Sequence, residues 1–498
     1  MCAYINTFMI KNLLILCMIA VALSTQSCKK KDGMGSVTPP VDSVAIPSKL
    51  DLLRDSIYLY TEEVYLWHEV LPSYVGFNPR QYTGTTDLQA AKNEMAAIRA
   101  LQPEDNRHSY SFVTTTAGSN AIQTGEDQDY GFFIKAGSVN KALSYDSVHW
   151  YVEYVYKNSP SGVAGVQRGW YITKINNSSI GYDNASVKIL NDVFFGTGST
   201  ANFEFTKSDG STVNVNLNKS AYTANSVLYT NVFTNGSTKT GYIVFNQFFG
   251  EVSRTELAKT FSDFASQGIN ELVVDLRYNH GGSTDTQNAL ADLIAPSSAD
   301  GKTMYTYIYN DSLQAGKFHL LSRKYNLSAT SFKPVNNTVK VQKTGSLNLS
   351  RVFFIVSHET ASASELLINN LRPYLDVKLL GDTTYGKPVG FFPIPIFEYA
   401  IYPISFKTVN SVGSAEYYDG FAPDKLTPDG INKNWGDLTE PSLASALRFI
   451  TTGSFNGRVF NQNVDVQDIL ILNAQKAYEP LNSKLYEKKF IGMFQEKK

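Results

Sequence analysis

The sequence has little cysteine, little histidine and no excess of charge of either sign. Its three cysteines, Cys2, Cys17 and Cys28, all fall within the first 28 of 498 residues, so the remainder of the chain has no cysteine from which to form a disulfide. The 44 basic and 45 acidic side chains give a formal charge of −1, and no long run of lysine or arginine is present. The electrostatic footprint that nucleic-acid binding requires is therefore absent.

The histidines also argue against a metal centre. The six of them are scattered, without an HExxH motif or a pair four residues apart, and no cysteine pair accompanies them. We therefore expect no metal and no cofactor. What the chain does have is 43% apolar and 13% aromatic residues over a length typical of about three domains, so it can bury substantial cores.

No apolar run near the N-terminus is long enough to span a bilayer. A basic residue, Lys11, is followed by an apolar stretch over residues 12–23 and by small residues that end at Cys28. This order is typical of an export signal. Ending at a cysteine, residues 1–28 resemble a bacterial lipoprotein signal, although Thr25 stands where an aliphatic residue is usual.

That resemblance implies that Cys28 is lipidated and anchors the protein in the cell envelope, at the outer membrane, on its periplasmic or its outer face. Ordinary secretion with cleavage nearby is the alternative. Met9 lies close before the basic residue and is a second candidate start beside Met1. Residues 29–46 are polar and rich in Gly, Pro and Ser, which predicts a flexible tether.

Hydrophobic periodicity then divides the chain into segments. Residues 47–118 carry apolar side chains at spacings of three and four, which predicts a small helical domain. Residues 119–222 change to the period of strands, residues 223–450 alternate strands with helices, and residues 451–498 form a C-terminal extension with weaker signals. The expected fold is a multidomain α/β protein.

The strand-rich segment contains a recognisable order of elements. The motif YGFFI is followed by a strand, by SPSGVAGVQRGWYITKINN and by a helical pattern. This order resembles a PDZ domain of the bacterial protease-associated kind. The resemblance implies that the YGFFI segment presents backbone N–H groups to the C-terminal carboxylate of a peptide that adds as a strand, through Tyr130, Gly131, Phe132, Phe133 and Ile134. A small β-barrel without a peptide site is the alternative.

Three loops of the α/β segment carry groups suited to catalysis. TASASELL follows the strand RVFFIVS and contains Ser362. Taken alone, the pattern Ser-x-x-Glu predicts that this serine is only a helix cap. At a helix N-terminus, however, a developing oxyanion is also stabilised. DLRYNHGG places Gly281 and Gly282 after a second strand, and TTYGKPVG places Lys387 after a third. Since such loops gather at one edge of an open sheet, we expect these residues to lie together.

These motifs resemble the C-terminal processing, or tail-specific, serine peptidases. The resemblance rests on DLRYNHGG, SASE and GDTTYGKPVG and covers roughly residues 120–435. It implies a crotonase/ClpP-like catalytic core, a Ser362 nucleophile and a Lys387 general base, 25 positions apart as in the family. It also implies an oxyanion hole from the backbone N–H of Ala363 and of Gly281 or Gly282, and protein or peptide substrates with free C-termini.

The chemistry fits these residue types, with one departure from the family. A lysine must lose its proton to act as a base, and burial lowers its pKa toward neutrality. Many family members orient the lysine with a third polar side chain, and the matching positions here are Pro373 and Phe391. Either the orienting group is missing or another part of the chain supplies it.

The sequence therefore predicts an exported serine endopeptidase with a Ser/Lys dyad. Three alternatives stay open: a Ser–His arrangement using His280 or His358, a peptide-binding protein of the same fold that does not cleave, and hydrolysis of a non-peptide ester or amide. Nothing in the sequence indicates the physiological substrate or the oligomeric state.

Overall fold

The computed structural model describes residues 46–138, 148–455 and 490–496. The predicted signal with Cys28, nearly all of the tether and most of the C-terminal extension lie outside the described residues. The chain divides into Met1–Pro47 and a compact unit, Ser48–Lys498, and every described helix and strand lies in the latter. None of these helices is both long and apolar enough to cross a membrane.

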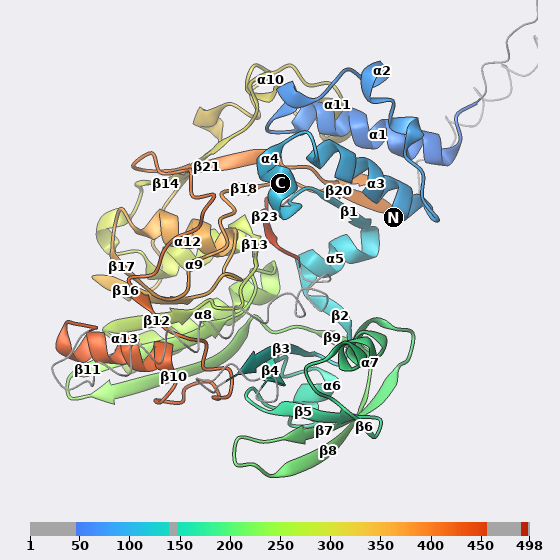
Figure 1. The fold of residues 1–498 in the computed structure, drawn as a ribbon. Coiled ribbons are helices and arrows are strands. Elements are labelled where there is room, and N and C mark those ends of the chain that lie inside the picture. The colour runs from blue at the N-terminus through green and yellow to red at the C-terminus, as the bar shows by residue number, and fades with distance from the viewer. Residues whose placement is uncertain (1–45, 139–147, 456–489, 497–498) are drawn as a thin grey trace, which may run out of the picture. The chain divides into compact units, whose positions relative to one another are not determined.

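A six-stranded sheet forms the centre of the predicted α/β segment (Figure 1). β10 pairs antiparallel with β11, and the remaining strands are parallel, in the order β10-β11-β12-β16-β17-β22. Near-continuous apolar runs such as RVFFIV suit strands that are covered on both faces. The strands are β10 (Val227–Asn235), β11 (Thr238–Phe245), β12 (Glu271–Asp275), β16 (Arg351–Val356), β17 (Asp376–Gly381) and β22 (Lys425–Leu426).

Helices cover both faces of this sheet. One cluster joins alternate strand residues to the apolar faces of α8, α9 and α12, while a second joins the intervening strand residues to α13. The alternation follows from the two-residue period of a strand. These helices are α8 (Glu251–Gln267), α9 (Thr284–Ile294), α12 (Ala363–Leu371) and α13 (Pro441–Thr452). The α/β alternation predicted from the sequence is confirmed.

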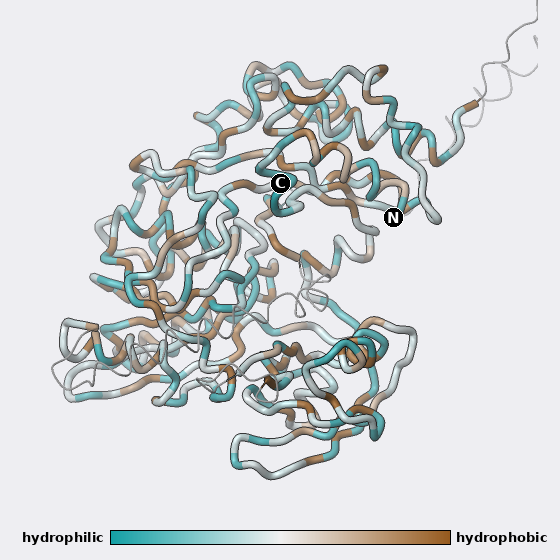
Figure 2. The backbone as a smooth tube through the Cα atoms, viewed as in Figure 1, coloured by the Kyte–Doolittle hydropathy of each residue, from teal (hydrophilic) through white to brown (hydrophobic). Residues whose placement is uncertain are grey.

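The N-terminal segment is helical, as its periodicity predicts. Ser48 caps α1 in a reciprocal capping box with Asp51, and Thr86 caps α3. Along the tube in Figure 2, hydrophobic and hydrophilic residues alternate over this segment. Most of its buried apolar side chains belong to the same hydrophobic cluster as α8, α9 and α12. The elements are α1 (Lys49–Val64), η1 (His68–Val70), α2 (Tyr74–Phe77), η2 (Pro79–Gln81), α3 (Asp87–Arg99) and α4 (Pro103–His108).

The helical prediction fails at the end of this segment. Phe112–Thr115 forms a strand, β1, which pairs antiparallel with β20 (Tyr399–Tyr402), and β20 pairs in turn with β19 (Ile394–Ile396). The partner strand is nearly 300 positions away, so no local pattern could reveal it. Aromatic and β-branched residues favour the extended backbone once such a partner is present. The predicted boundary after residue 118 falls inside the next helix, α5 (Thr116–Thr124).

A separate antiparallel sheet occupies the strand-rich segment and has its own core. Its order is β3-β4-β5-β7-β8, with β6 (Ser178–Ser179) on β5, and Trp150 and Phe203 lie fully buried within it. Among the described residues β3 pairs with β4 alone, so it is an edge strand. The elements are β3 (Phe132–Ser138), β4 (Val148–Val155), α6 (Pro160–Val163), β5 (Tyr171–Ile175), α7 (Asn184–Phe195), β7 (Thr200–Thr206) and β8 (Thr212–Asn218).

Shorter elements complete the compact unit. β2 (Glu126–Asp129) pairs with β9 (Ser220–Thr223), and a four-stranded sheet has the order β15-β14-β21-β18. A two-stranded sheet pairs β13 (Gly281–Ser283) with β23 (Gly492–Phe494). The remaining elements are η4 (Ser297–Ala299), β14 (Thr303–Ile308), α10 (Asp311–Gln314), α11 (Leu320–Tyr325), η5 (Pro334–Asn336), β15 (Thr338–Lys340), β18 (Val389–Gly390) and β21 (Phe406–Asn410).

Candidate active site

The three loops that follow β12, β16 and β17 meet at the carboxyl edge of the central sheet. The Ala361 N–H donates to the Asn279 carbonyl at 3.0 Å, and the Tyr385 N–H donates to the Thr360 carbonyl at 3.0 Å. The Thr360 hydroxyl also donates to the Leu276 carbonyl at 2.8 Å. These bonds join each loop to its neighbour. The structure therefore brings together the glycine loop, Ser362 and Lys387, as the order of elements predicts.

Ser362 is the N-cap of α12 and has a strained backbone. Its φ of 59° and ψ of −108° place a non-glycine residue in a sparsely populated region. Such strain costs on the order of 1–3 kcal/mol and persists only where the surroundings impose it, often at functional sites. The side chain is fully buried, and its hydroxyl oxygen has no hydrogen-bond partner among the described residues. The serine is therefore more than an ordinary cap.

The buried carboxylate of Glu365 imposes this geometry. One oxygen accepts the N–H groups of Ser362 and Lys387, at 2.9 and 2.8 Å. The other accepts the Gly386 N–H at 2.7 Å and the Thr384 hydroxyl at 2.6 Å. Burial raises the pKa of Glu365, while these four hydrogen bonds oppose the rise. A single carboxylate thus connects the serine turn to the lysine loop.

Lys387 lies in an apolar cage. It is fully buried, with its Nζ 4.6 Å from the ring centre of Tyr110 and 4.7 Å from that of Phe391. Desolvation lowers the pKa of Lys387 from 10.5 to about 7, although Asp105 and Glu365 act in the opposite direction. A lysine in this state can take up a proton near neutral pH. Phe391, one of the two positions where the family has a polar orienting group, instead packs its ring against the ammonium.

The Lys387 ammonium is oriented by a group that sequence reasoning missed. Its Nζ donates to the backbone carbonyl of Ile491, in the segment that ends in β23, at 2.8 Å. It makes no hydrogen bond to the Ser362 hydroxyl. A backbone carbonyl has no sequence signature, and Ile491 is 104 positions away.

The glycine loop lies beside the serine turn. Gly281 and Gly282 have φ values of 101° and 136°, which favour glycine, and a Cβ on Gly281 would lie 3.0 Å from the Ala363 nitrogen. The Gly281 N–H donates to the Asn279 side chain at 2.9 Å. Of the two glycine N–H groups considered for an oxyanion hole, that of Gly281 is therefore already occupied.

His280 lies beside an ion pair. Its Nε2 lies 3.4 Å from one oxygen of Glu359, whose other oxygen accepts from Lys135 of β3 at 2.7 Å. Since the Ser362 hydroxyl has no partner among the described residues, neither His280 nor His358 is hydrogen-bonded to it. Nowhere in the described ranges do three His, Cys, Asp or Glu side chains cluster as a metal ion would require.

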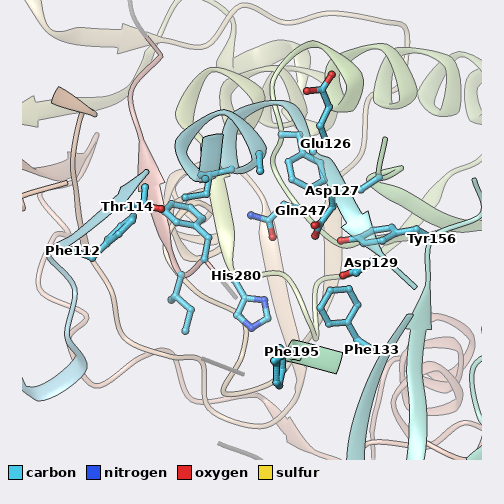
Figure 3. A pocket seen from close by; sticks show the side chains of 18 of the residues that line it. Phe112, Thr114, Glu126, Asp127, Asp129, Phe133, Tyr156, Phe195, Gln247 and His280 are labelled. Atoms are coloured by element: carbon cyan, nitrogen blue, oxygen red, sulfur yellow. The ribbon is translucent and has the colours of Figure 1, made fainter. Parts of the chain in front are cut away.

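A cavity of about 750 Å³ leads from the edge strand β3 to this site. Its lining includes the predicted peptide-binding residues Phe132, Phe133 and Ile134 together with Tyr385 and Ile491. Tyr130 and Gly131 lie directly before β3 and do not line it. Figure 3 shows His280 and Gln247 in the cavity with aromatic side chains around them, including Phe112, Phe133, Tyr156 and Phe195.

Residues 239–424, which include all three loops, match the model of peptidase family S41. The match covers 186 of the 498 residues, and this part of the chain is similar to peptidase family S41. The family is one of serine peptidases, and the motifs on which the sequence resemblance rested, DLRYNHGG, SASE and GDTTYGKPVG, all fall inside the matched S41 region.

Individual relatives agree with the family. Proteins of several Staphylococcus aureus strains, named "Probable CtpA-like serine protease", are 26% identical over 236 residues. The match covers 47% of this chain and 40% of the relatives' length. The crystal structure of a Bacteroides fragilis NCTC 9343 protein assigned to the S41 proteases is 23% identical, covers 80% of this chain and 97% of its own, and has a TM-score of 0.59. The fold is thus similar to that of an S41 protease.

The lowered pKa of Lys387 leads to a prediction about stability. Because the pKa is about 7 in the folded chain and near 10.5 when unfolded, the unfolded state binds more protons between these values, so wild-type stability rises with pH over this range. Lys387→Met removes the buried charge. We expect it to raise the free energy of unfolding by about 2–4 kcal/mol at pH 7 and by much less near pH 10.

Urea unfolding at several pH values measures this difference. Lys259→Met, which changes an exposed lysine paired with Asp263, is the matched control and should leave the pH dependence unchanged. An identical pH slope in wild type and Lys387→Met would contradict the lowered pKa.

Proposed function

We propose that the protein is a serine endopeptidase in which Ser362 is the nucleophile and Lys387 the general base. The observation that carries this proposal is the pairing of a strained, buried serine with a desolvated lysine, both held by Glu365 within the S41 region. The proposal includes a core of the crotonase/ClpP-like type, which the parallel sheet with helices on both faces supports.

The reaction follows from the chemistry of these groups. Neutral Lys387 takes the proton of the Ser362 hydroxyl as the oxygen attacks a peptide carbonyl, and the resulting ammonium protonates the leaving amine. Water then hydrolyses the acyl-enzyme. The N–H of Ala363, at the N-terminus of α12, and that of Gly282 are our candidates for stabilising the oxyanion, because the N–H of Gly281 is bound to Asn279.

We propose further that substrates enter along β3. As an edge strand among the described residues, β3 can pair with a peptide as an added strand, and Phe194 of α7 packs its ring 5.2 Å from that of Phe132 to form an apolar wall. This arrangement supports the PDZ-like interpretation of residues 119–222. The cavity that begins here reaches Ile491, whose carbonyl accepts the hydrogen bond from Lys387.

The YGFFI segment, which we propose binds the C-terminal carboxylate of a substrate, is directly preceded by an acidic residue, Asp129. Asp129 accepts the Gly131 N–H at 2.6 Å and the Tyr222 hydroxyl at 2.7 Å through the same oxygen. A C-terminal carboxylate that binds to the YGFFI segment must therefore approach a like charge, which weakens its binding. Asp129 would then limit how strongly a free C-terminus is preferred.

A protein that binds peptides without cleaving them is the second candidate. The observation in its favour is the missing hydrogen bond between the Ser362 hydroxyl and Lys387, whose ammonium binds the Ile491 carbonyl instead. The presence of both Ser362 and Lys387, with Glu365 joining their loops, favours the peptidase.

Localisation belongs to the proposal too. We propose export and lipid anchoring through Cys28, on the basis of the sequence of residues 1–28.

The catalytic roles predict the behaviour of two substitutions. Ser362→Ala and Lys387→Ala should each slow cleavage of an unfolded protein with an apolar C-terminus by about 10³-fold or more while leaving the chain folded. In wild type, kcat/KM should fall as the pH drops below about 7, because the protonated lysine cannot accept the serine proton. Full activity in Ser362→Ala would exclude this nucleophile. Binding without cleavage by wild type would favour the second candidate.

The position of Asp129 leads to a prediction about how strongly the chain binds peptides with a charged or an uncharged C-terminus. We expect Asp129→Asn to bind a free-acid peptide about three- to tenfold more tightly than wild type and an amidated peptide with unchanged affinity. Fluorescence anisotropy with the two peptides measures this difference. Asp127→Asn removes another cavity-lining carboxylate and is the control. Equal affinity for acid and amide in every variant would exclude recognition of the C-terminus.

Lipid anchoring predicts a labelling result. When the full chain is expressed in a bacterial host with radiolabelled palmitate, wild type and Cys17→Ala should incorporate label and fractionate with membranes, whereas Cys28→Ala should do neither. Label in Cys28→Ala would exclude anchoring at this residue.

A further inference from the structure

Residues 490–496 form an extended segment, the 490–496 strand, that lies within the candidate site. Its β23 portion pairs in parallel with β13, so that Gly492 is opposite Gly281 and Met493 opposite Gly282. The Gly492 N–H donates to the His280 carbonyl at 3.0 Å. On its other side the strand exchanges two backbone hydrogen bonds with Phe391, through Met493 and Gln495, each of 3.1 Å. The strand thus fills the space between the glycine loop and the segment after Lys387.

The backbone carbonyls of this strand lie next to the groups that would act on a substrate. The Ile491 carbonyl accepts the Lys387 ammonium at 2.8 Å. A Cβ on Gly281 would lie 2.4 Å from the Gly492 carbonyl oxygen and 3.0 Å from the Ala363 nitrogen. Consecutive carbonyls therefore lie at the general base and beside the candidate oxyanion donors, where a substrate carbonyl would have to bind.

The strand also separates the catalytic groups from the cavity. Phe490 and Ile491 line the cavity wall, whereas Ser362 and Lys387 do not line it and have no exposed surface. With the strand in place, a peptide that enters along β3 meets Ile491 before it meets the serine. A permanent strand would leave no room for a substrate against the glycine loop.

Side chains hold the strand in one register. Met493 and Phe494 are fully buried, and the Phe490 ring packs 5.9 Å from that of Phe391. Glu496 pairs with Arg254 at 2.8 Å, and the Tyr309 hydroxyl donates to the Gln495 side chain at 3.1 Å. Gly492 has no space for a side chain, since a Cβ there would lie 2.6 Å from the Phe391 ring and 3.2 Å from the Lys387 nitrogen.

We propose that the 490–496 strand is an internal inhibitory segment that occupies the substrate groove of the catalytic core. The inference rests on the proposed peptidase function. It adds that the 490–496 strand closes the groove and that the groove fits an extended chain. Because the strand is bound largely through backbone hydrogen bonds, an extended substrate can replace it in the same register. Tethering gives the strand a high effective concentration, so only a substrate that is itself held nearby, as on β3, competes well.

Binding can be tested without catalysis, in chains that carry Ser362→Ala. A fluorescent peptide of residues 490–498, FIGMFQEKK, is titrated into the full chain and into a chain ending at Lys489. We expect saturable binding to the shortened chain and at least tenfold weaker binding to the full chain. Equal binding to both chains, or no binding to a shortened chain that retains its thermal unfolding transition, would overturn the proposal.

Two full-length variants test the same point if the shortened chain does not fold. Gly492→Leu introduces a side chain where the Phe391 ring leaves no space, and Glu496→Ala removes the ion pair with Arg254. Both variants should bind the peptide more tightly than the full chain that carries Ser362→Ala alone. For Gly492→Leu we expect at least tenfold tighter binding. Glu251→Ala removes the other carboxylate bound to Arg254, outside the strand, and should bind as the unsubstituted chain does. Unchanged binding in Gly492→Leu and Glu496→Ala would overturn the proposal.

Cleavage assays with Ser362 intact separate the two proposals. We expect the shortened chain to cleave an unfolded protein at least tenfold faster than the full chain. If both chains cleave at the same rate, the peptidase function stands and inhibition by the strand is excluded. If the shortened chain binds FIGMFQEKK and cleaves nothing, the strand's occupancy of the groove is supported and the peptidase function is excluded.

Discussion

The buried carboxylate of Glu365 is the interaction on which the site depends. It accepts hydrogen bonds from Ser362, Thr384, Gly386 and Lys387, and so joins the loop after β16 to the loop after β17. Burying a carboxylate is costly unless hydrogen bonds replace its hydration, and here four donors do so. The same bonds set the distance between the serine turn and the lysine loop. A substitution at Glu365 would therefore disturb both loops at once.

Two neighbouring features are unfavourable by themselves. Ser362 has a backbone conformation that non-glycine residues avoid. Lys387 is enclosed by the rings of Tyr110 and Phe391, and within the described part of the chain its Nζ donates to a backbone carbonyl rather than to a carboxylate. Strain and desolvation of this kind reduce stability, and the surrounding sheet and helices offset the cost. In exchange, the serine is presented at a helix N-terminus and the lysine becomes a base near neutral pH, as nucleophilic catalysis requires.

The 490–496 strand and the cavity are physically connected. Ile491 contributes to the cavity wall and also supplies the carbonyl that binds Lys387. The pair formed by Lys135 of β3 and Glu359, three positions before Ser362, links the edge strand to the serine loop at 2.7 Å. The edge strand β3 and the loop that carries Ser362 therefore adjoin each other. The 490–496 strand also accounts for the missing hydrogen bond between Ser362 and Lys387, because the lysine donates to the Ile491 carbonyl of this strand instead.

The sequence by itself determined the features that depend on local patterns. The periods of 3.6 and 2 predict the helices of residues 49–108 and the strands of the central sheet, and their alternation places three loops at one edge. The motifs around Gly281, Ser362 and Lys387 identify residues that the structure brings together. Only the tertiary structure decided the partners that are distant in the chain. β1 is a strand because β20 lies beside it, and Lys387 is enclosed by Tyr110 and bound by Ile491. The hydrogen bond of Asp129 to the YGFFI loop and the occupation of the glycine loop by β23 are decided in the same way. Every residue except proline carries the same backbone N–H and carbonyl groups, so the sequence does not show which of these groups pair in the folded chain.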